Sequence, residues 1–206
     1  MQIITIYPRG FGANTYVLTT DNQTAVVIDP AMPSVIDELK KKGLQAKHVL
    51  LTHCHFDHVG GVDALQDAGA KVYCLDEEKP LFGSSADLCA LFGAPPITFT
   101  IDKTFYDKEE IEFCSLKIQV LHTAGHTKGS ACYLITDETG KKYLFTGDTL
   151  FAGSIGRTDF PTGNISEIRN SLRFLSSLDD MPIYAGHNEE TTLAKEKQSN
   201  PFLLDL

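Results

Sequence analysis

Basic residues are scarce in this chain, which has 18 lysines and arginines against 27 aspartates and glutamates and a net charge of −9. Nucleic-acid phosphates are normally bound by a basic face, so this balance argues against a nucleic-acid partner. No apolar run approaches the roughly 20 residues of a membrane span, and we expect no membrane partner. Segment 1–8 lacks a basic stretch followed by an apolar one, which indicates a strand and not a signal peptide.

Paired cysteine motifs are also absent. The five cysteines are scattered without any Cys-x-x-Cys spacing, at positions Cys54, Cys74, Cys89, Cys114 and Cys132. An odd, dispersed set is typical of reduced thiols in a core, so we expect a cytoplasmic protein. Cys54 lies between two histidines, and we expect a structural role for it, turned away from them.

No long linker or low-complexity stretch interrupts the sequence, so residues 1–206 are expected to form one domain with a substantial core. Apolar patterns predict strands at 3–7, 15–19, 25–29, 47–52, 70–75, 111–114, 116–120, 131–136 and 142–145, and helices at 34–42, 59–68, 165–176 and 192–198. Asn164 and Glu167 form a capping-box pattern before the helix at 165–176. This order by itself predicts α/β or α+β.

Six residues, His53-Cys54-His55-Phe56-Asp57-His58, bring three imidazoles and a carboxylate together. These groups are ligands that Zn²⁺ and its neighbours prefer, although the same residues could be surface histidines with Asp57 as a helix cap. They follow a predicted strand and precede a predicted helix, the usual place for a site in α/β sheets. In an extended loop His53 and His55 point to one side, while His58 and Asp57 lie beyond the turn. The spacing therefore predicts two adjacent metal sites.

This stretch resembles the His-x-His-x-Asp-His signature of the metallo-β-lactamase superfamily. Four further segments resemble the other motifs of that family in the same order, namely 27–30 with Asp29, 123–130 with His126, 145–149 with Asp148 and 184–187 with His187. The resemblance covers nearly the whole chain. It implies an α+β fold, an αββα sandwich of two stacked mixed β-sheets with helices outside.

The resemblance also implies a ligand set. His53, His55 and His126 would hold a first metal; Asp57, His58 and His187 would hold a second; Asp148 would bridge the two, and Asp29 would support the ligands from behind. Two divalent ions are expected, zinc first, with iron or manganese compatible with nitrogen and oxygen ligands. A hydroxide shared by the metals is the expected nucleophile, and Asp57 is the predicted catalytic residue that orients it.

Segment 151–161 resembles type II glyoxalase-like hydrolases, which implies hydrolysis of a small-molecule thioester such as a hydroxyacylglutathione. Ser154 is expected to line the substrate pocket. Arg157 has two interpretations: it meets an anionic group of the substrate, or it pairs with Asp159 to hold its loop. About twenty residues follow His187, so we expect no counterpart of the C-terminal helical domain that holds much of the glutathione in type II glyoxalases. We therefore expect weak activity on the glutathione ester.

Two other functions are compatible with these residues. A related segment occurs in persulfide dioxygenases, so a mononuclear iron persulfide dioxygenase is the first alternative. A metal-binding domain without catalytic activity is the second, and the intact ligand set argues against it. Phe56 and Gly60 resemble the hydrolase branch more closely. No pattern in the sequence indicates an oligomeric state.

Overall fold

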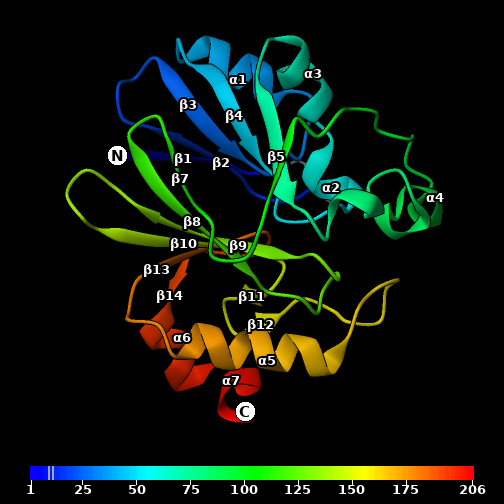
Figure 1. Ribbon diagram of the computed structural model, residues 1–206, viewed down its shortest axis with the longest axis vertical. Helices are drawn as coiled ribbons and strands as arrows, with labels where there is room; N and C mark the ends of the chain where they lie inside the picture. The colour runs from blue at the N-terminus through cyan, green and yellow to red at the C-terminus, as the bar shows by residue number, and fades with distance from the viewer. Residues whose placement is uncertain (9, 11) are drawn as a thin grey trace.

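Two six-stranded sheets stack face to face in the computed structural model, which describes residues 1–8, 10 and 12–206 (Figure 1). The first sheet has the spatial order β1 (Gln2–Ile6), β2 (Thr15–Thr19), β3 (Thr24–Ile28), β4 (Gln45–Leu50), β5 (Lys71–Leu75) and β6 (Lys103–Phe105). Strands β1 to β3 pair antiparallel, and β3 to β6 pair parallel. The sheet is therefore mixed, and its parallel strands require connections that cross over one face.

The second sheet is built mainly from the later part of the chain. Its spatial order is β14 (Thr191–Thr192), β13 (Pro182–Ala185), β10 (Lys142–Gly147), β9 (Ala131–Thr136), β8 (Leu116–His122) and β7 (Glu110–Phe113). Strands β10 and β13 pair parallel, and the other neighbours pair antiparallel. A short hairpin of β11 (Leu150–Phe151) and β12 (Ser154–Ile155) follows β10.

Helices cover the outer face of each sheet. Those between strands of the first sheet are α1 (Val35–Lys41), α2 (Phe56–Val59), α3 (Val62–Asp67), η1 (Lys79–Leu81), η2 (Ser85–Asp87) and α4 (Cys89–Phe92); those with the second sheet are α5 (Ile165–Ser176), α6 (Leu193–Ser199) and α7 (Pro201–Leu204). Figure 1 shows α1 and α3 above the first sheet and α5 to α7 below the second. No helix among the described residues is long and apolar enough to cross a membrane.

Three apolar layers hold these elements together. Along β3, Val26 and Ile28 face the second sheet, while Val27 faces the helices α1 and α3, as the two-residue period of a strand requires. The central layer contains the fully buried Tyr133 and Phe145. A third layer packs α5 to α7 against the far face of the second sheet. This arrangement confirms the predicted α+β sandwich with helices outside.

The predicted helix at 59–68 is divided in the structure into α2 and α3, and the first of these begins earlier, at Phe56. Gly60 and Gly61 lie at the break because the backbone that follows β3 passes close to them. A Cβ atom on Gly60 would lie 2.4 Å from the carbonyl oxygen of Ala31, and one on Gly61 would lie 2.3 Å from that of Met32. The continuous helix was therefore a wrong prediction, overturned by a close tertiary contact.

Candidate metal centre

The predicted site residues meet at one end of the sandwich, where strands from both sheets end. The segment after β4 supplies His53, His55, Asp57 and His58, while His126, Asp148 and His187 follow β8, β10 and β13. Three groups of these side chains, counting Asp29, place their nitrogen and oxygen atoms within 4.8 Å of one another. These groups contain six of the seven predicted ligands, and Asp148 lies within 3.5 Å of His58, His126 and His187.

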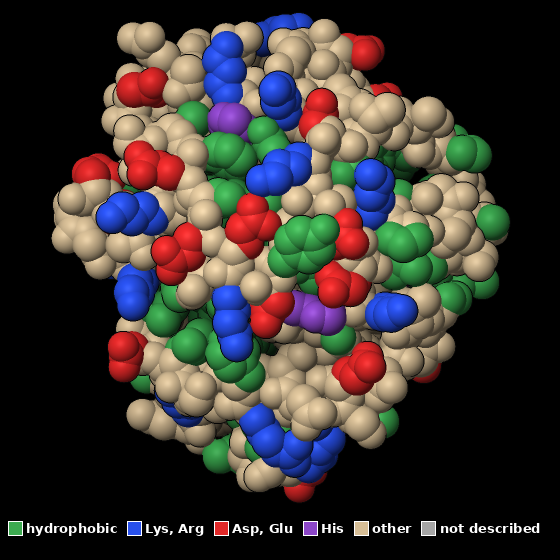
Figure 2. All heavy atoms as spheres, in the orientation of Figure 1, with side chains coloured by type: hydrophobic (Ala, Val, Ile, Leu, Met, Phe, Trp, Pro, Cys, Tyr) green, Lys and Arg blue, Asp and Glu red, His purple; other side chains and the backbone are tan. Residues whose placement is uncertain are grey.

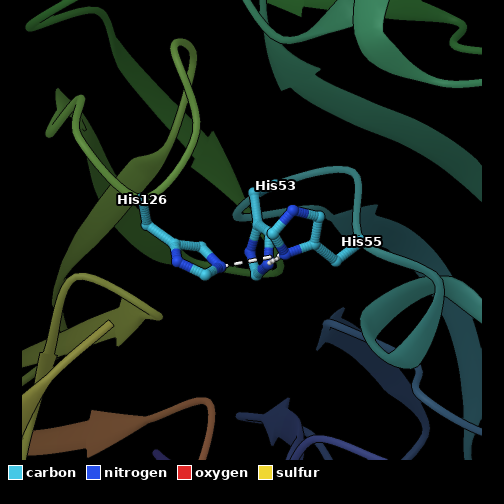
Figure 3. Close-up of side chains that lie close together, drawn as sticks. All are labelled: His53, His55 and His126. Atoms are coloured by element: carbon cyan, nitrogen blue, oxygen red, sulfur yellow. Dashed lines mark hydrogen bonds between the residues drawn. The ribbon is translucent and has the colours of Figure 1, made fainter. Parts of the chain in front are cut away.

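Three buried histidines form the first group, shown in Figure 3. The Nδ1 atom of His55 lies 3.0 Å from Nε2 of His53 and 2.9 Å from Nε2 of His126. The other ring nitrogen of His126, Nδ1, donates to the carbonyl oxygen of Arg157 at 2.8 Å, which leaves Nε2 with a bare lone pair when the ring is neutral. One proton on His55 could satisfy only one of its two neighbours. This convergence of nitrogens suits a metal ion.

Asp29 fixes the orientation of His53 and of a further histidine, His58. Thr52 donates to its carboxylate twice, from the backbone nitrogen at 2.8 Å and from the hydroxyl at 2.6 Å. Because the hydroxyl proton is used there, Thr52 Oγ1 accepts from Nδ1 of His53 at 3.1 Å. Nδ1 of His58 donates to Asp29 Oδ2 at 2.8 Å. The Nε2 atoms of both histidines are thus turned toward the site, as a supporting carboxylate does for metal ligands.

Asp29 is held in an uncommon backbone conformation, with a φ angle of +47°. Aspartate tolerates this left-handed region better than most residues, and such conformations gather at functional sites. The residue is buried. Its carboxylate lies behind Thr52 and His58, and its role as a support for metal ligands stays a prediction.

Asp148 lies between the three-histidine group and a second group of Asp57, His58 and His187. Its Oδ1 is 3.3 Å from Nε2 of His58, and its Oδ2 is 3.5 Å from Nε2 of His126 and 3.4 Å from Nε2 of His187. Oδ2 of Asp57 lies 3.3 Å from the same atom of His187. One carboxylate therefore reaches both groups, which is the geometry that a bridging ligand requires.

Gly186 permits this approach, since a Cβ atom there would lie 2.3 Å from Oδ1 of Asp148. Among the described residues, four buried side-chain polar atoms lack a hydrogen-bond partner, and three belong to this site: His55 Nε2, His58 Nε2 and Asp148 Oδ1. Buried polar atoms are almost always satisfied in folded proteins. His58 Nε2 and Asp148 Oδ1 lie 3.3 Å apart inside the cluster, so these two atoms fit a centre that binds metal, and their nitrogen and oxygen chemistry suits zinc, iron or manganese.

The electrostatics of the two groups differ. Burial and the neighbouring His126 and His58 lower the pKa of His55 to about 3, and burial likewise lowers the pKa of His126. Burial also acts against the charged form of His58, but three nearby carboxylates raise its pKa well above the ordinary value. Hydrogen bonds to Asp148 and Asp57 outweigh burial at His187 and raise its pKa to about 9. These shifts favour neutral rings in the three-histidine group and the charged form of His58 and His187, which lie beside aspartates.

A cavity of about 740 Å³ opens beside these residues, and His55, Asp57, Asp148 and His187 line it. Ser154 and Arg157 line it as well. The guanidinium of Arg157 donates to both carboxylate oxygens of Asp159, at 2.6 Å each, and lies 3.8 Å from the ring centroid of Phe160. The structure thus shows the pairing of Arg157 with Asp159 that holds its loop.

Glu78 is a buried residue of the site region that the sequence analysis did not single out. Its Oε1 accepts from the backbone nitrogen of Cys54 at 2.7 Å. Its Oε2 accepts from the hydroxyl of Thr127 at 2.8 Å and from the backbone nitrogen of Gly129 at 2.9 Å. It therefore ties the loop of His53 and His55 to the loop of His126. Glu77, the identical residue beside it, is exposed. The sequence therefore offered no means of telling which of the two glutamates has this role.

Two side chains near the motifs stay outside the cluster. The Sγ atom of Cys54 lies 3.5 Å from the carbonyl oxygen of Ala86, and burial raises the pKa of this thiol. Nε2 of His122 bonds to the carbonyl oxygen of Lys128 at 2.9 Å. The structure brings neither into the metal groups, in agreement with the structural role expected for Cys54.

Comparisons with known proteins agree with this geometry. The family model of the metallo-beta-lactamase superfamily matches residues 8–187. The hydroxyacylglutathione hydrolase GloC of Haemophilus influenzae is 38% identical over 211 residues, which cover 98% of each protein. The crystal structure of the BLEG-1 B3 metallo-beta-lactamase has a TM-score of 0.88 at 32% identity and covers 98% of this chain and 99% of its own. That of TTHA1623 in a di-iron-bound form has a TM-score of 0.82 at 32% identity, covering 98% and 100%.

Proposed function

The chain belongs to the metallo-β-lactamase superfamily, and from that premise we propose that it is a metal-dependent hydrolase of small-molecule thioesters. One observation carries the proposal: Asp148 reaches both His58 and His126, so two groups of ligands share one carboxylate. The similarity to a protein named hydroxyacylglutathione hydrolase supports the thioester as substrate.

In this proposal each group would hold one divalent ion. His53, His55 and His126 would hold the first, Asp57, His58 and His187 would hold the second, and Asp148 would serve both. Zinc is the first expectation, and the di-iron form of a similar structure supports iron as an alternative. Two such ions would supply Lewis acidity and would lower the pKa of a bound water molecule to about 7.

Asp57 has the position that a catalytic carboxylate needs. It lines the cavity, its side chain is 18% exposed against 9% for Asp148, and its Oδ2 lies 3.3 Å from His187. A carboxylate there can orient the attacking water and accept its proton. Attack on the thioester carbonyl breaks the carbon–sulfur bond and releases a carboxylic acid and a thiol. Because a thiolate is a good leaving group, the reaction does not depend on a dedicated general acid.

The test combines metal analysis with two assays on one anaerobically purified preparation. Elemental analysis is expected to give close to two metals per chain. S-Lactoylglutathione and other thioesters are expected to release thiol without oxygen consumption. Oxygen uptake with glutathione persulfide, and no hydrolysis of any thioester, would instead assign the chain to the persulfide dioxygenases. If a fully metallated protein catalyses neither reaction, the chain would instead be a metal-binding domain without catalytic activity.

A further inference from the structure

A row of aromatic side chains leads from the metal centre along one wall of the cavity. The ring of Phe160 contacts His55 edge-on with centroids 5.9 Å apart, Phe92 lies 5.9 Å from Phe160, and Phe56 lies 5.4 Å from Phe92. All three phenylalanines line the cavity. They come from α2, from α4 and from the loop before α5, so three separate segments build one continuous aromatic wall.

This wall is open to solvent at its outer end. The side chain of Phe92 is 56% exposed, although Leu88 beside it is buried. Figure 2 shows hydrophobic side chains gathered at the right-hand edge of the molecule, where Figure 1 places α4. Ligand sites are typically concave and mostly apolar, with a few polar groups that orient the reacting atoms. Here the polar groups are the metal ligands and the apolar surface adjoins them.

The peptide glutathione carries two carboxylates. Among the described residues that line the cavity, Arg157 is the one lysine or arginine side chain. Both oxygens of Asp159 already pair with that guanidinium, and its flat face lies on Phe160. A neutral, apolar body therefore suits this cavity better than a charged peptide.

The size of the cavity is compatible with such a ligand. Its volume of about 740 Å³ leaves room beside the metal ligands for a bulky group that would cover the aromatic wall. Cavities of this volume usually enclose ligands of drug-like size. On the basis of the proposed function, we propose that the substrate is a thioester with a phenyl-sized or branched apolar group, and that this group packs on Phe56, Phe92 and Phe160.

The apolar group could belong to the acyl part or to the thiol part of the ester, and matched substrates distinguish these. The metal-loaded protein would be assayed with S-acetyl-N-acetylcysteamine as the small reference, S-phenylacetyl-N-acetylcysteamine, S-benzyl thioacetate and S-lactoylglutathione. One of the two phenyl-bearing esters is expected to have a kcat/KM at least about tenfold above the reference. That excess identifies which side of the ester meets the wall.

The test quantity is the preference ratio, that is, kcat/KM for the better phenyl-bearing ester divided by kcat/KM for S-acetyl-N-acetylcysteamine. Phe92→Ala is expected to reduce this ratio by about tenfold. Leu91→Ala is the matched control, because Leu91 is 64% exposed on the same helix and does not line the cavity. Its ratio should equal that of the unmodified protein. Equal ratios in all three proteins, with thioesters still hydrolysed, would overturn the inference and leave the proposed function standing.

A binding measurement separates the two proposals completely. The thioether S-benzyl-N-acetylcysteamine cannot be hydrolysed, and calorimetry should show it binding the metal-loaded protein at least fivefold more tightly than it binds Phe92→Ala. If the thioether binds in this way but no thioester is hydrolysed, the proposed function is refuted, while the proposal that the wall binds an apolar group is retained.

Discussion

Replacing Glu78 by glutamine should weaken metal binding at the three-histidine group without touching any proposed ligand. The carboxylate accepts three hydrogen bonds that join the loops carrying His55 and His126. A glutamine can keep its oxygen where Oε2 lies and still accept from Thr127 and Gly129. Its amide group must then face the backbone nitrogen of Cys54 across 2.7 Å, so that two donors meet.

The magnitude follows from that mismatch. Loss of one hydrogen bond to a charged acceptor, with a buried donor left unsatisfied, costs roughly 1.5–3 kcal/mol. Burial raises the pKa of Glu78, so removing its charge recovers part of this cost. A net penalty of about 2 kcal/mol remains, which corresponds to at most an approximately 30-fold loss of affinity if all of it opposes the binding geometry.

Zinc affinity would be measured by competition with a chromophoric chelator in Glu78→Gln and in Glu77→Gln. The second variant makes the same charge change at an exposed neighbour and should bind zinc like the unmodified protein. Urea unfolding of the metal-free proteins would show whether the fold survives in both. Zinc affinities within twofold of each other would refute the idea that Glu78 positions the ligand loops.

Three further outcomes can be checked. Asp57→Asn should keep the fold but lose about 10²-fold or more in kcat at full metal loading, since an amide cannot accept the proton of water; unchanged kcat would remove Asp57 from the reaction. Asn200→Ala should lower the free energy of unfolding by about 2 kcal/mol in urea, because its side chain donates to the carbonyl oxygens of Phe151 and Ser154 in the hairpin that lines the cavity. Burial and two nearby lysines lower the pKa of His48, so the folded protein resists its protonation and loses stability as pH falls below about 6.5. The metal-free His48→Phe variant should lose less stability between pH 7 and 5 in the same urea assay, and equal losses would contradict this.

Features of the fold that depend only on residues close together in the sequence were predictable. The helix at 165–176 has the predicted bounds, and the side chain of Asn164 accepts from the backbone nitrogens of Ser166 and Glu167. The helix α7 was not predicted, since the last predicted helix ends at residue 198, before Asn200-Pro201. In the structure Asn200 caps a new helix and Pro201 occupies its first turn. Either outcome is compatible with proline locally, and packing against α5 and α6 decides between them.

The site residues also fall into a predictable set and a set that was not predictable. The family motifs identified seven candidate ligands, because each motif is short and its spacing is set by one loop. Glu78 could not be found by such reasoning, since its partners Cys54 and Gly129 are 24 and 51 residues away. The aromatic wall was equally hidden, because Phe56, Phe92 and Phe160 become neighbours only after three segments fold together.

The placement of β13 at the side of β10 has a consequence for how the protein is made. The strand that carries His187 pairs in parallel with β10, and both follow the first sheet in the chain. During synthesis, the segment with His53, His55 and His58 therefore leaves the ribosome well before Asp148 and His187. Domains emerge from the amino terminus onward at about 5–20 residues per second. The proposed metal centre is complete only when the last strands have been translated, which makes metal uptake a late event in the life of the nascent chain.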